Sequence, residues 1–326
     1  MASMLRALRR RVLTPNPSAA LMAERGFHVK SPEGKELLET IGQTFLTGYA
    51  YAAEAKAPAD AEERLEQIPT RFRGFAYEGA GMAYAIRDGL PIGGSKHFAG
   101  FLEGRAANHE YMAWIGLGWA LARLPRFRWS RFVVEDPLMR WLVLDGYGFH
   151  QAYFKTDKYV HRQYREPDFP WPGGPLGWYA DRAIDQGIGR ALWFVGGTDP
   201  ELVAELIGRF GEDRRPDLYA GAGLAATYAG GVDEGELRRF WKLAEKYRSE
   251  VRQGAAFAAT ARSEAGLMVP HTVLALKMFC GLAPEDAERL CREARPRQAP
   301  EGDIPAFEVW RRRIAEAIAS PAQVDP

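Results

Sequence analysis

The sequence has only two cysteines, Cys280 and Cys291, and no long apolar run. Gly281 and Pro284 separate the two thiols, so neither a disulfide framework nor a zinc-knuckle spacing is available, and a reducing cytoplasm is the expected location. The longest apolar stretches, such as 141–144, fall far short of the roughly 20 residues that cross a bilayer. We therefore expect no transmembrane helix.

Net charge is also nearly absent, since 43 Lys and Arg residues face 42 Asp and Glu residues. No overall field favours nucleic acid, and we expect no nucleic-acid partner. The one basic amphipathic stretch is 4–13, which no apolar signal-peptide core follows. Two interpretations of it are open, a basic N-terminal arm and a membrane-surface anchor.

Motifs for metal and cofactor binding are missing. The six histidines show no ligand spacing, and His109-Glu110 lacks a second histidine four residues later, so no metal site is expected. Segments 187–189 and 221–223 resemble pieces of a dinucleotide fingerprint, but no strand is expected before either. We expect no cofactor. An Asp-rich diphosphate motif and a Gly-x-Ser-x-Gly elbow are absent too.

What the chain does contain is one small-residue signature, repeated seven times. Each copy reads Gly, any residue, Gly or Ala, any residue, Ala, and His150 takes the last place of the fourth copy. The copies begin at Gly48, Gly79, Gly116, Gly146, Gly187, Gly221 and Gly254. Successive copies begin 31, 37, 30, 41, 34 and 33 residues apart, a period typical of helical-hairpin repeats. The composition predicts about one match by chance.

The stretches between the copies are charged and amphipathic. An acidic first turn at 199–201 opens the stretch 202–210, and another at 233–234 opens 237–247. Segment 60–68 has the same place ahead of the second copy. Each unit is thus an outer charged helix followed by an inner small-residue helix. We predict an all-α fold, an array of about seven αα-hairpin repeats that forms a superhelix or an αα-toroid.

The chain divides into three predicted parts. Residues 1–30 are a basic N-terminal arm, 31–294 the helical-hairpin repeat domain, and 295–326 a C-terminal capping helix and tail. The largest interruption is 161–178, where proline and glycine alternate with aromatic residues. Such a segment cannot be helical, yet it is too aromatic for a plain linker. We predict an ordered flap there.

The register of the signature predicts which side chains share a face. Because successive residues of a helix are about 100° apart, the small residues make each inner helix thin on two opposite flanks, as packing between two neighbours requires. Of the faces between these flanks, one is apolar and is expected to pack on the outer helices. The other, at one place before and three and six places after the first glycine, mixes polar and aromatic residues: Glu78, Met82, Ile115, Trp119, Asp145, Phe149, Gln186, Arg190, Trp193, Gln253, Phe257 and Thr260.

This mixed face is the candidate site. If the array curves with its inner helices on the concave side, the face lines a groove or central cavity suited to an elongated ligand with an apolar or unsaturated body. The residues expected to contact the ligand are Arg190, Gln186, Gln253, Trp119, Phe149, Trp193 and Tyr153. A second interpretation is open, in which the polar residues cross-link neighbouring hairpins and touch no ligand.

Candidate acids and bases are Glu78, Asp145 and His150. Segment 145–153 is the densest polar cluster on any inner helix, and a carboxylate and an imidazole about one and a half turns apart can share proton transfer. The alternative for His150 is a structural histidine. Arg190 either forms a structural ion pair with Glu78 or Asp145, or binds a carboxylate or phosphate of the ligand.

Five blocks of the sequence resemble the bacterial UnbL-type family, a domain family of unknown function associated with enediyne polyketide biosynthesis. They are GQTFLTG at 42–48, RGFAYEG at 73–79, GWALARLP at 118–125, DGYGFHQ at 145–151 and DQGIGRALWFVGG at 185–197. The likeness runs from about residue 11 to 315. It implies a pathway, in which such proteins act on or escort the polyene product of an iterative polyketide synthase, and it carries over no catalytic residues.

Two functions follow as hypotheses. The first is an enzyme or accessory protein of enediyne-type biosynthesis that binds a linear polyene-like intermediate in its concave face and catalyses proton transfer or isomerisation. The second is a noncatalytic scaffold that docks the polyketide synthase or other pathway proteins. A closed, aromatic-lined cavity favours the first, and an open superhelix with a flat groove favours the second.

Overall fold

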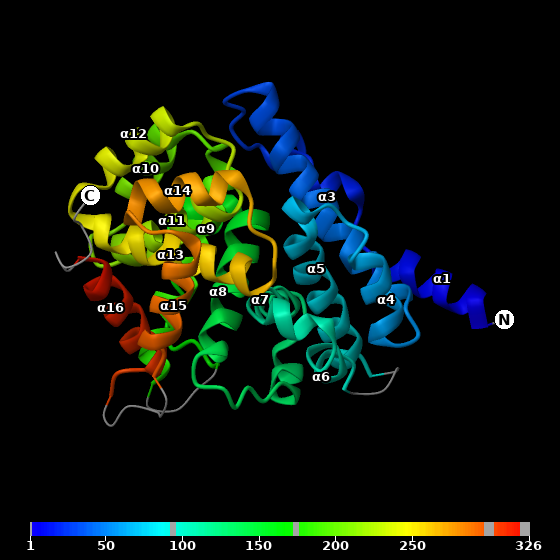
Figure 1. Cartoon of the computed structure of the whole chain (residues 1–326). Helices are drawn as coiled ribbons and strands as arrows, with labels where there is room; N and C mark the ends of the chain where they lie inside the picture. Colours follow the sequence, from blue (N-terminus) through cyan, green and yellow to red (C-terminus); the bar gives the residue numbers. More distant parts are fainter. Residues whose placement is uncertain (1, 92–95, 172–175, 297–302, 320–326) are drawn as a thin grey trace.

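The computed structural model of the chain is all-helical (Figure 1). It describes residues 2–91, 96–171, 176–296 and 303–319, and no strand occurs within them. The α-helices are α1 (Ala2–Leu13), α2 (Met22–Arg25), α3 (Pro32–Glu54), α4 (Pro58–Leu65), α5 (Thr70–Gly89), α6 (His97–Leu102), α7 (Glu110–Leu121), α8 (Met139–Phe154), α9 (Ala180–Val195), α10 (Pro200–Gly208), α11 (Arg215–Tyr228), α12 (Glu234–Ala244), α13 (Arg248–Glu264), α14 (Pro270–Cys280), α15 (Pro284–Ala294) and α16 (Ala306–Ala319).

The seven helices that carry the signature, which we call the inner helices, lie side by side in chain order. α3 packs on α5, α5 on α7, α7 on α8, α8 on α9, α9 on α11 and α11 on α13. The helices α10, α12 and α14 contact one another and form an outer layer over α9, α11 and α13. None of the described helices combines the length and the apolar character that a bilayer crossing requires.

The signature glycines lie where the backbones of neighbouring inner helices touch. A Cβ atom on Gly187 would lie 1.9 Å from the carbonyl oxygen of Asp145 on the preceding inner helix, and one on Gly189 would lie 2.1 Å from that of Leu218 on the next. Gly116 and Gly118 have the same two relations to α5 and α8. The prediction that small residues thin each inner helix on two opposite flanks is therefore confirmed at these glycines.

Capping residues start several helices where the sequence indicates. The Ser31 hydroxyl accepts a hydrogen bond from the Gly34 amide at the start of α3. Asp199 caps α10 ahead of Pro200, and Asp233 forms a capping box with Glu236 at the start of α12. Each cap satisfies amide groups that have no partner within the helix. The two outer helices predicted after the acidic turns are both present.

The expectation of an outer helix in every unit is wrong for two of the connections. Segment 122–138 between α7 and α8 contains only a 3₁₀ turn, Arg126–Arg131, and the described residues of segment 155–179 between α8 and α9 contain only short π and 3₁₀ turns. Prolines within both segments remove amide donors and restrict the preceding residue, which prevents a long helix.

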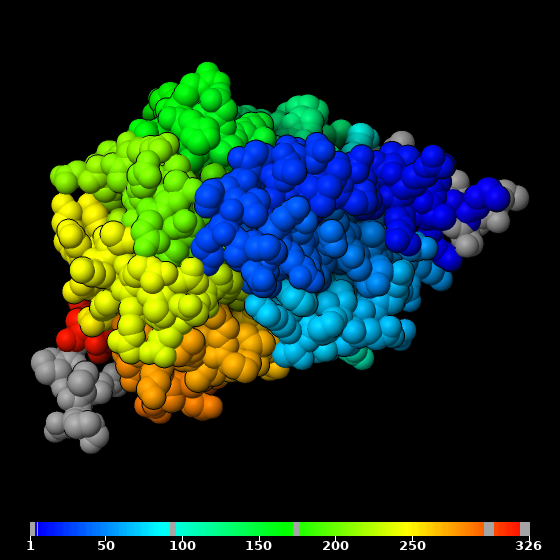
Figure 2. Space-filling model, turned by 90° about the horizontal axis from the view of Figure 1, so that it is seen from above, coloured from blue at the N-terminus to red at the C-terminus, as the bar shows by residue number. Residues whose placement is uncertain are grey.

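The early and late parts of the chain are in direct contact. The His28 amide donates to the carbonyl of Val195 at 3.0 Å, and the Lys30 ammonium pairs with Glu236 at 2.6 Å. Arg262 at the end of α13 donates to the backbone carbonyl of Arg71 in α5 at 3.1 Å. Figure 2 shows the blue N-terminal segment against the yellow-green and yellow segments. The inner helices therefore surround a common interior.

The first and the last described segments are both helical, and each packs on a different part of the molecule. Arg9 of α1 donates to the backbone carbonyls of Ala53, Glu54 and Ala55, the C-terminal end of α3. The predicted C-terminal helix is α16, which packs on α13 and α15. The single hydrophobic core reaches from Met22 to Ile318.

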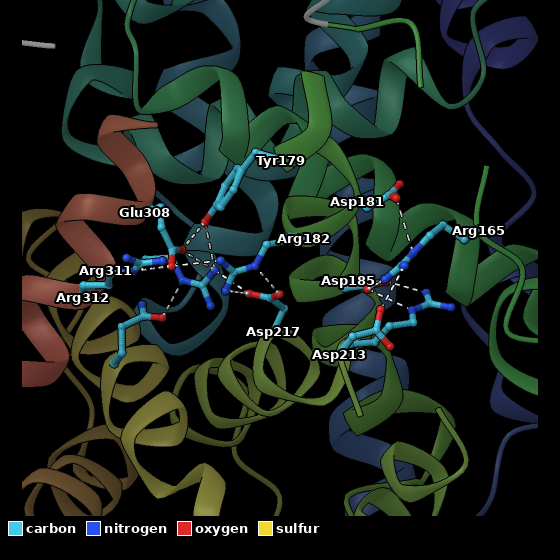
Figure 3. Close-up of polar contacts among 12 residues, drawn as sticks. Arg165, Tyr179, Asp181, Arg182, Asp185, Asp213, Asp217, Glu308, Arg311 and Arg312 are labelled. Atoms are coloured by element: carbon cyan, nitrogen blue, oxygen red, sulfur yellow. Dashed lines mark hydrogen bonds and ion pairs between the residues drawn. The ribbon is translucent and has the colours of Figure 1, made fainter. Parts of the chain in front are cut away.

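The predicted flap, 161–178, is partly described, since 172–175 lie outside the described residues. Its Phe169 is buried between Trp129 and Tyr147, with ring centroids 5.7 and 5.1 Å away. Its Arg165 forms ion pairs with Asp181, Asp185 and Asp213 (Figure 3). Aromatic packing and ion pairs thus hold the described part of the flap against the start of α9.

Candidate functional site

The inner helices enclose a cavity of about 100 Å³. All seven contribute to its wall, together with Trp310 of α16 and the segment after α1 that contains Pro15, Ala19 and Ala20. The aromatic lining residues are Phe45, Phe75, Tyr111, Trp119, Phe149, Tyr153, Phe154, Phe194, Tyr228, Phe257 and Trp310. A void of this size that touches every inner helix is a narrow slot rather than a round chamber.

Aromatic rings form a continuous wall across four helices. Phe45 of α3 lies 4.4 Å from Trp119 of α7, which lies 5.2 Å from Phe149 of α8, measured between ring centroids. Phe149 lies 5.2 Å from Phe194 of α9 in an edge-to-face arrangement. Such pairs gain energy beyond the area they bury and leave flat apolar surfaces.

Two charged side chains, Glu78 and Arg190, stand in this apolar wall. Both are almost fully buried, and their side chains approach to 3.9 Å. The Arg190 guanidinium makes its close ion pair with Asp145 instead, and the other oxygen of Asp145 accepts a 2.8 Å hydrogen bond from the Gln186 amide. Both carboxylate oxygens of Asp145 thus have a partner. The cation nearest to Glu78, the Arg190 guanidinium, is beyond hydrogen-bond distance.

Burial raises the pKa of Glu78 to about 7, because an ionised carboxylate is poorly solvated in this apolar wall. The positive charge of Arg190 opposes this rise, and the negative charge of Asp145 adds to it. The indole nitrogen of Trp119 is near enough to lower the pKa of Glu78 but does not meet hydrogen-bond geometry. Near neutral pH, Glu78 is therefore present in both its acid and its base form.

His150 lines the same cavity but has the opposite electrostatics. Burial lowers its pKa to about 3, and the positive charges of Arg123 and Lys155 lower it further. Its ring lies 5.5 Å from Trp119 and 4.7 Å from Phe154. His150 is therefore a neutral imidazole at physiological pH and a poor base. No hydrogen bond or ion pair between the described residues joins it to Asp145.

Four buried polar atoms at the cavity wall have no protein partner. They are Trp119 Nε1, His150 Nδ1, the Tyr228 hydroxyl and Thr260 Oγ1. Buried polar groups in folded proteins nearly always have a hydrogen-bond partner, and leaving one unpaired costs about 1–3 kcal/mol. All four belong to residues that line one cavity, so the occupant of that cavity is the candidate for the missing partner.

The structure brings six of the predicted site residues to the cavity wall. These are Glu78, His150, Arg190, Trp119, Phe149 and Tyr153. Asp145 and Gln186 lie behind the wall, where they hold Arg190.

Two predicted binding residues lie away from the cavity. Trp193 packs against Phe240 of the outer helix α12 and donates to the Gly230 carbonyl at 2.9 Å. The amide oxygen of Gln253 accepts a 3.0 Å hydrogen bond from Arg311 of α16. The expectation that Trp193 and Gln253 line the site is therefore wrong.

The helical register explains why Trp193 misses the cavity and why three further lining residues are not predicted, whereas Gln253 is instead engaged by Arg311 of α16. Residues four apart on a helix differ by about 40° in direction, whereas residues three apart differ by about 60° to the other side. The cavity face thus continues from the third place after the first glycine to the seventh in most copies, although Thr260 of α13 lines the cavity from the sixth. Arg123, Phe194 and Tyr228 stand at this seventh place in their copies and line the cavity.

The described residues offer no site for a metal ion, since they contain no group of three or more His, Cys, Asp or Glu side chains that could hold one. Both cysteines are unpaired thiols.

Fold and site together define an all-helical protein with an aromatic-lined cavity that holds Glu78 and Arg190 in its apolar wall. The chain belongs to the DUF1702 family, described as proteins of unknown function, whose model matches residues 4–318. No curated protein and no solved structure matches the chain. The family match gives no link to the UnbL-type family or to enediyne biosynthesis, so that resemblance stays a prediction.

Proposed function

We propose that the protein binds a slender, largely apolar small molecule in the cavity and exchanges a proton with it through Glu78. The observation that carries this proposal is the set of four unpaired polar atoms, which surround one enclosed apolar slot. An apolar pocket with a few convergent polar groups and a strongly shifted acid is the usual form of a small-molecule site. A flat docking surface for proteins has no need of such an interior.

The proposed ligand is an unsaturated chain. Flat aromatic walls suit a planar conjugated body, and the narrow slot disfavours fused or branched ring systems. A long polyene is larger than the empty cavity, so the wall has to yield when it enters. Met82 and Met112 line the cavity, and their flexible side chains can move aside.

The proposed chemistry is a proton shift along the chain. A group with a pKa near the working pH can both donate and accept a proton, and Glu78 fulfils this condition. Arg190, held by Asp145, is a fixed positive charge beside it and would stabilise negative charge that develops on the ligand. His150 takes the part of a neutral hydrogen-bonding group rather than that of a base.

We further propose that the inner helices are units of an αα-hairpin array bent into a closed toroid, with two units that have lost their outer helix. The recurring glycine contacts between successive inner helices support this interpretation. The resemblance to the UnbL-type family supports a linear polyene of an enediyne-type pathway as the ligand. The enclosed cavity favours this role over the scaffold.

The test is expression of the wild type, Glu78→Gln and the exposed control Glu103→Gln in a host that makes the pathway polyene and lacks its own copy. Native mass spectrometry of the purified proteins identifies the bound molecule. We expect Glu78→Gln to retain an unconverted ligand and to lose product at least tenfold, because the amide exchanges no proton. Full product formation by a folded Glu78→Gln would refute the catalytic role, and protein that purifies empty would count against ligand binding.

A further inference from the structure

The cavity meets solvent at Arg123, the one lining residue of the described chain that is exposed. Phe154 also lines the cavity and is half-buried, and its ring centroid lies 4.7 Å from that of the His150 imidazole. We call this place, formed by Arg25, Arg123, Phe154 and Lys155, the mouth. It joins the solvent to the aromatic wall, since Phe154 also lies 5.9 Å from Trp119.

Three cations from separate segments gather at the mouth. The Arg25 guanidinium of α2 lies 5.3 Å from the centre of the Phe154 ring. Arg123 follows α7, and Lys155 follows α8; both act on buried His150 by their positive charge. Cations from three segments around one opening create a positive electrostatic potential, which attracts the negatively charged part of a ligand.

None of these cations is neutralised by the described part of the protein. Arg25, Arg123 and Lys155 make no ion pair and no side-chain hydrogen bond there, and the buried Nε of Arg25 lacks a partner. The nearby carboxylate of Glu39 is engaged by the backbone amide of Met22 at 3.0 Å. Arg190 deeper in the cavity differs, because it is already paired with Asp145.

His150 adds an independent sign of a bound group. It is only 6% exposed, lines the cavity next to the mouth, and its Nδ1 has no hydrogen-bond partner. A carboxylate oxygen placed between Arg123 and a neutral imidazole N–H would satisfy both groups. Guanidinium groups bind carboxylates with charge-assisted hydrogen bonds about twice as strong as neutral ones.

We propose that the ligand of this cavity is an anionic amphiphile, a linear chain whose terminal carboxylate binds Arg123, Arg25 and His150 at the mouth while its apolar body extends along Trp119 toward Glu78. This inference rests on the proposed cavity function and adds the chemical class and the direction of entry. In this orientation the reacting part of the ligand lies at Glu78, and its carboxylate lies at the surface of the protein.

The experiment uses the full-length protein and the fluorescent tetraene parinaric acid as a reporter. Hexadecanoic acid, hexadecan-1-ol and hexadecyl phosphate are then compared as competitors, since they share one chain and differ in the head group. For the wild type we expect an affinity for hexadecanoic acid at least tenfold higher than for hexadecan-1-ol, as measured by displacement of the reporter. A difference of this size is typical of one charge-assisted contact.

The variants are Arg123→Gln and, as a matched control, the exposed Arg313→Gln on α16. We expect the Arg123→Gln variant to bind hexadecanoic acid no more tightly than hexadecan-1-ol. Its affinity for hexadecan-1-ol should differ less than twofold from that of the wild type. A folded Arg123→Gln that still prefers the acid tenfold would overturn the inference. Arg25→Gln provides a second test, with a smaller loss expected for the acid alone.

Other outcomes separate the inference from the proposed function. Equal binding of acid and alcohol by the wild type refutes the anionic head group but leaves cavity binding intact. Displacement by hexadecyl phosphate alone assigns the mouth to a phosphate ester and overturns the carboxylate. If none of the three competitors binds, and parinaric acid itself does not bind either, both proposals are overturned.

Discussion

At the scale of single residues, the signature glycines allow the backbones of neighbouring helices to touch; they do not serve as flexible hinges. A Cβ atom on Gly118 would lie 1.9 Å from the Val143 carbonyl oxygen and 2.7 Å from the Tyr147 amide nitrogen, both of which belong to the backbone of α8. Backbone atoms inside a helix cannot rotate away as a side chain can. Any larger residue therefore has to separate α7 from α8.

We expect Gly118→Ala to destabilise the protein by roughly 2 kcal/mol or more, because overpacking at this contact outweighs the gain of about 1 kcal/mol in helix propensity. The matched control is Gly208→Ala in α10, where an added Cβ meets nothing within 4 Å. This control should be neutral or stabilising by up to about 1 kcal/mol. Chemical unfolding curves measure both, and a Gly118→Ala protein as stable as the wild type would contradict the contact.

Glu78 makes stability depend on pH. Its pKa is about 7 in the folded protein, above the ordinary value of 4.5, so the folded state binds the extra proton between these pH values. The stabilisation is fully present below pH 4.5 and is lost as pH rises through 7.

We therefore expect Glu78→Gln to flatten the fall in unfolding free energy between pH 5 and 8. At pH 8 the variant should exceed the wild type by up to about 3 kcal/mol, the value of the full shift. Glu103→Gln, with an exposed side chain, should leave the pH profile unchanged. Parallel profiles of Glu78→Gln and wild type would show that the carboxyl titrates normally.

Much of the site follows from residue register alone. The sequence predicts that Glu78, Trp119 and Phe149 line the cavity. On each inner helix, the residue one place before the first glycine and the residue three places after it lie on the same face. It does not predict that Asp145 turns behind the wall, since only the position of Arg190 on the adjacent helix decides that contact. Long-range pairs of this kind leave no periodic trace.

At the scale of elements, α16 is held by a buried network of charges (Figure 3). Arg311 donates to Asp217 at 2.6 Å and to the Tyr179 hydroxyl at 3.0 Å, and Arg182 links Asp217 to Glu308 of α16 at 2.9 Å on each side. The network joins α16 to α9 and α11. It places Trp310 of α16 at the cavity wall.

We expect Arg311→Met to cost about 3–5 kcal/mol, because it removes a buried cation that pairs with the buried carboxylates of Asp217 and Glu308. Proteolysis should then cut before α16 at lower denaturant than in the wild type. The control Arg313→Met on the exposed side of α16 should change stability by less than about 0.5 kcal/mol. Equal protease resistance of both variants would mean that the network does not hold the helix.

Element boundaries are predictable where local chemistry sets them. Asp199 and Asp233 cap α10 and α12 as their sequence indicates, because capping depends on neighbours within a few residues. The missing outer helices around α8 are harder to foresee, since the repeat period holds there although the intervening segments cannot form a helix.

At the scale of the whole molecule, the early and late helices meet and close the interior. The contacts of Lys30 with Glu236 and of Arg262 with the Arg71 carbonyl join segments far apart in the chain. Nothing local in the sequence encodes these pairs, so the choice between an open groove and a closed cavity needs the structure. In the function that we propose, this closure makes the mixed face a site for a small molecule.

The most direct measurement of the central claim is a titration with parinaric acid of the wild type and of Ala225→Phe, whose new ring fills the cavity from α11. Ala107→Phe, an exposed substitution outside the cavity, is the control. We expect saturable binding of one ligand by the wild type and the control, with at least tenfold weaker binding by a folded Ala225→Phe. Equal affinity in all three proteins, or no binding to the wild type, would contradict it.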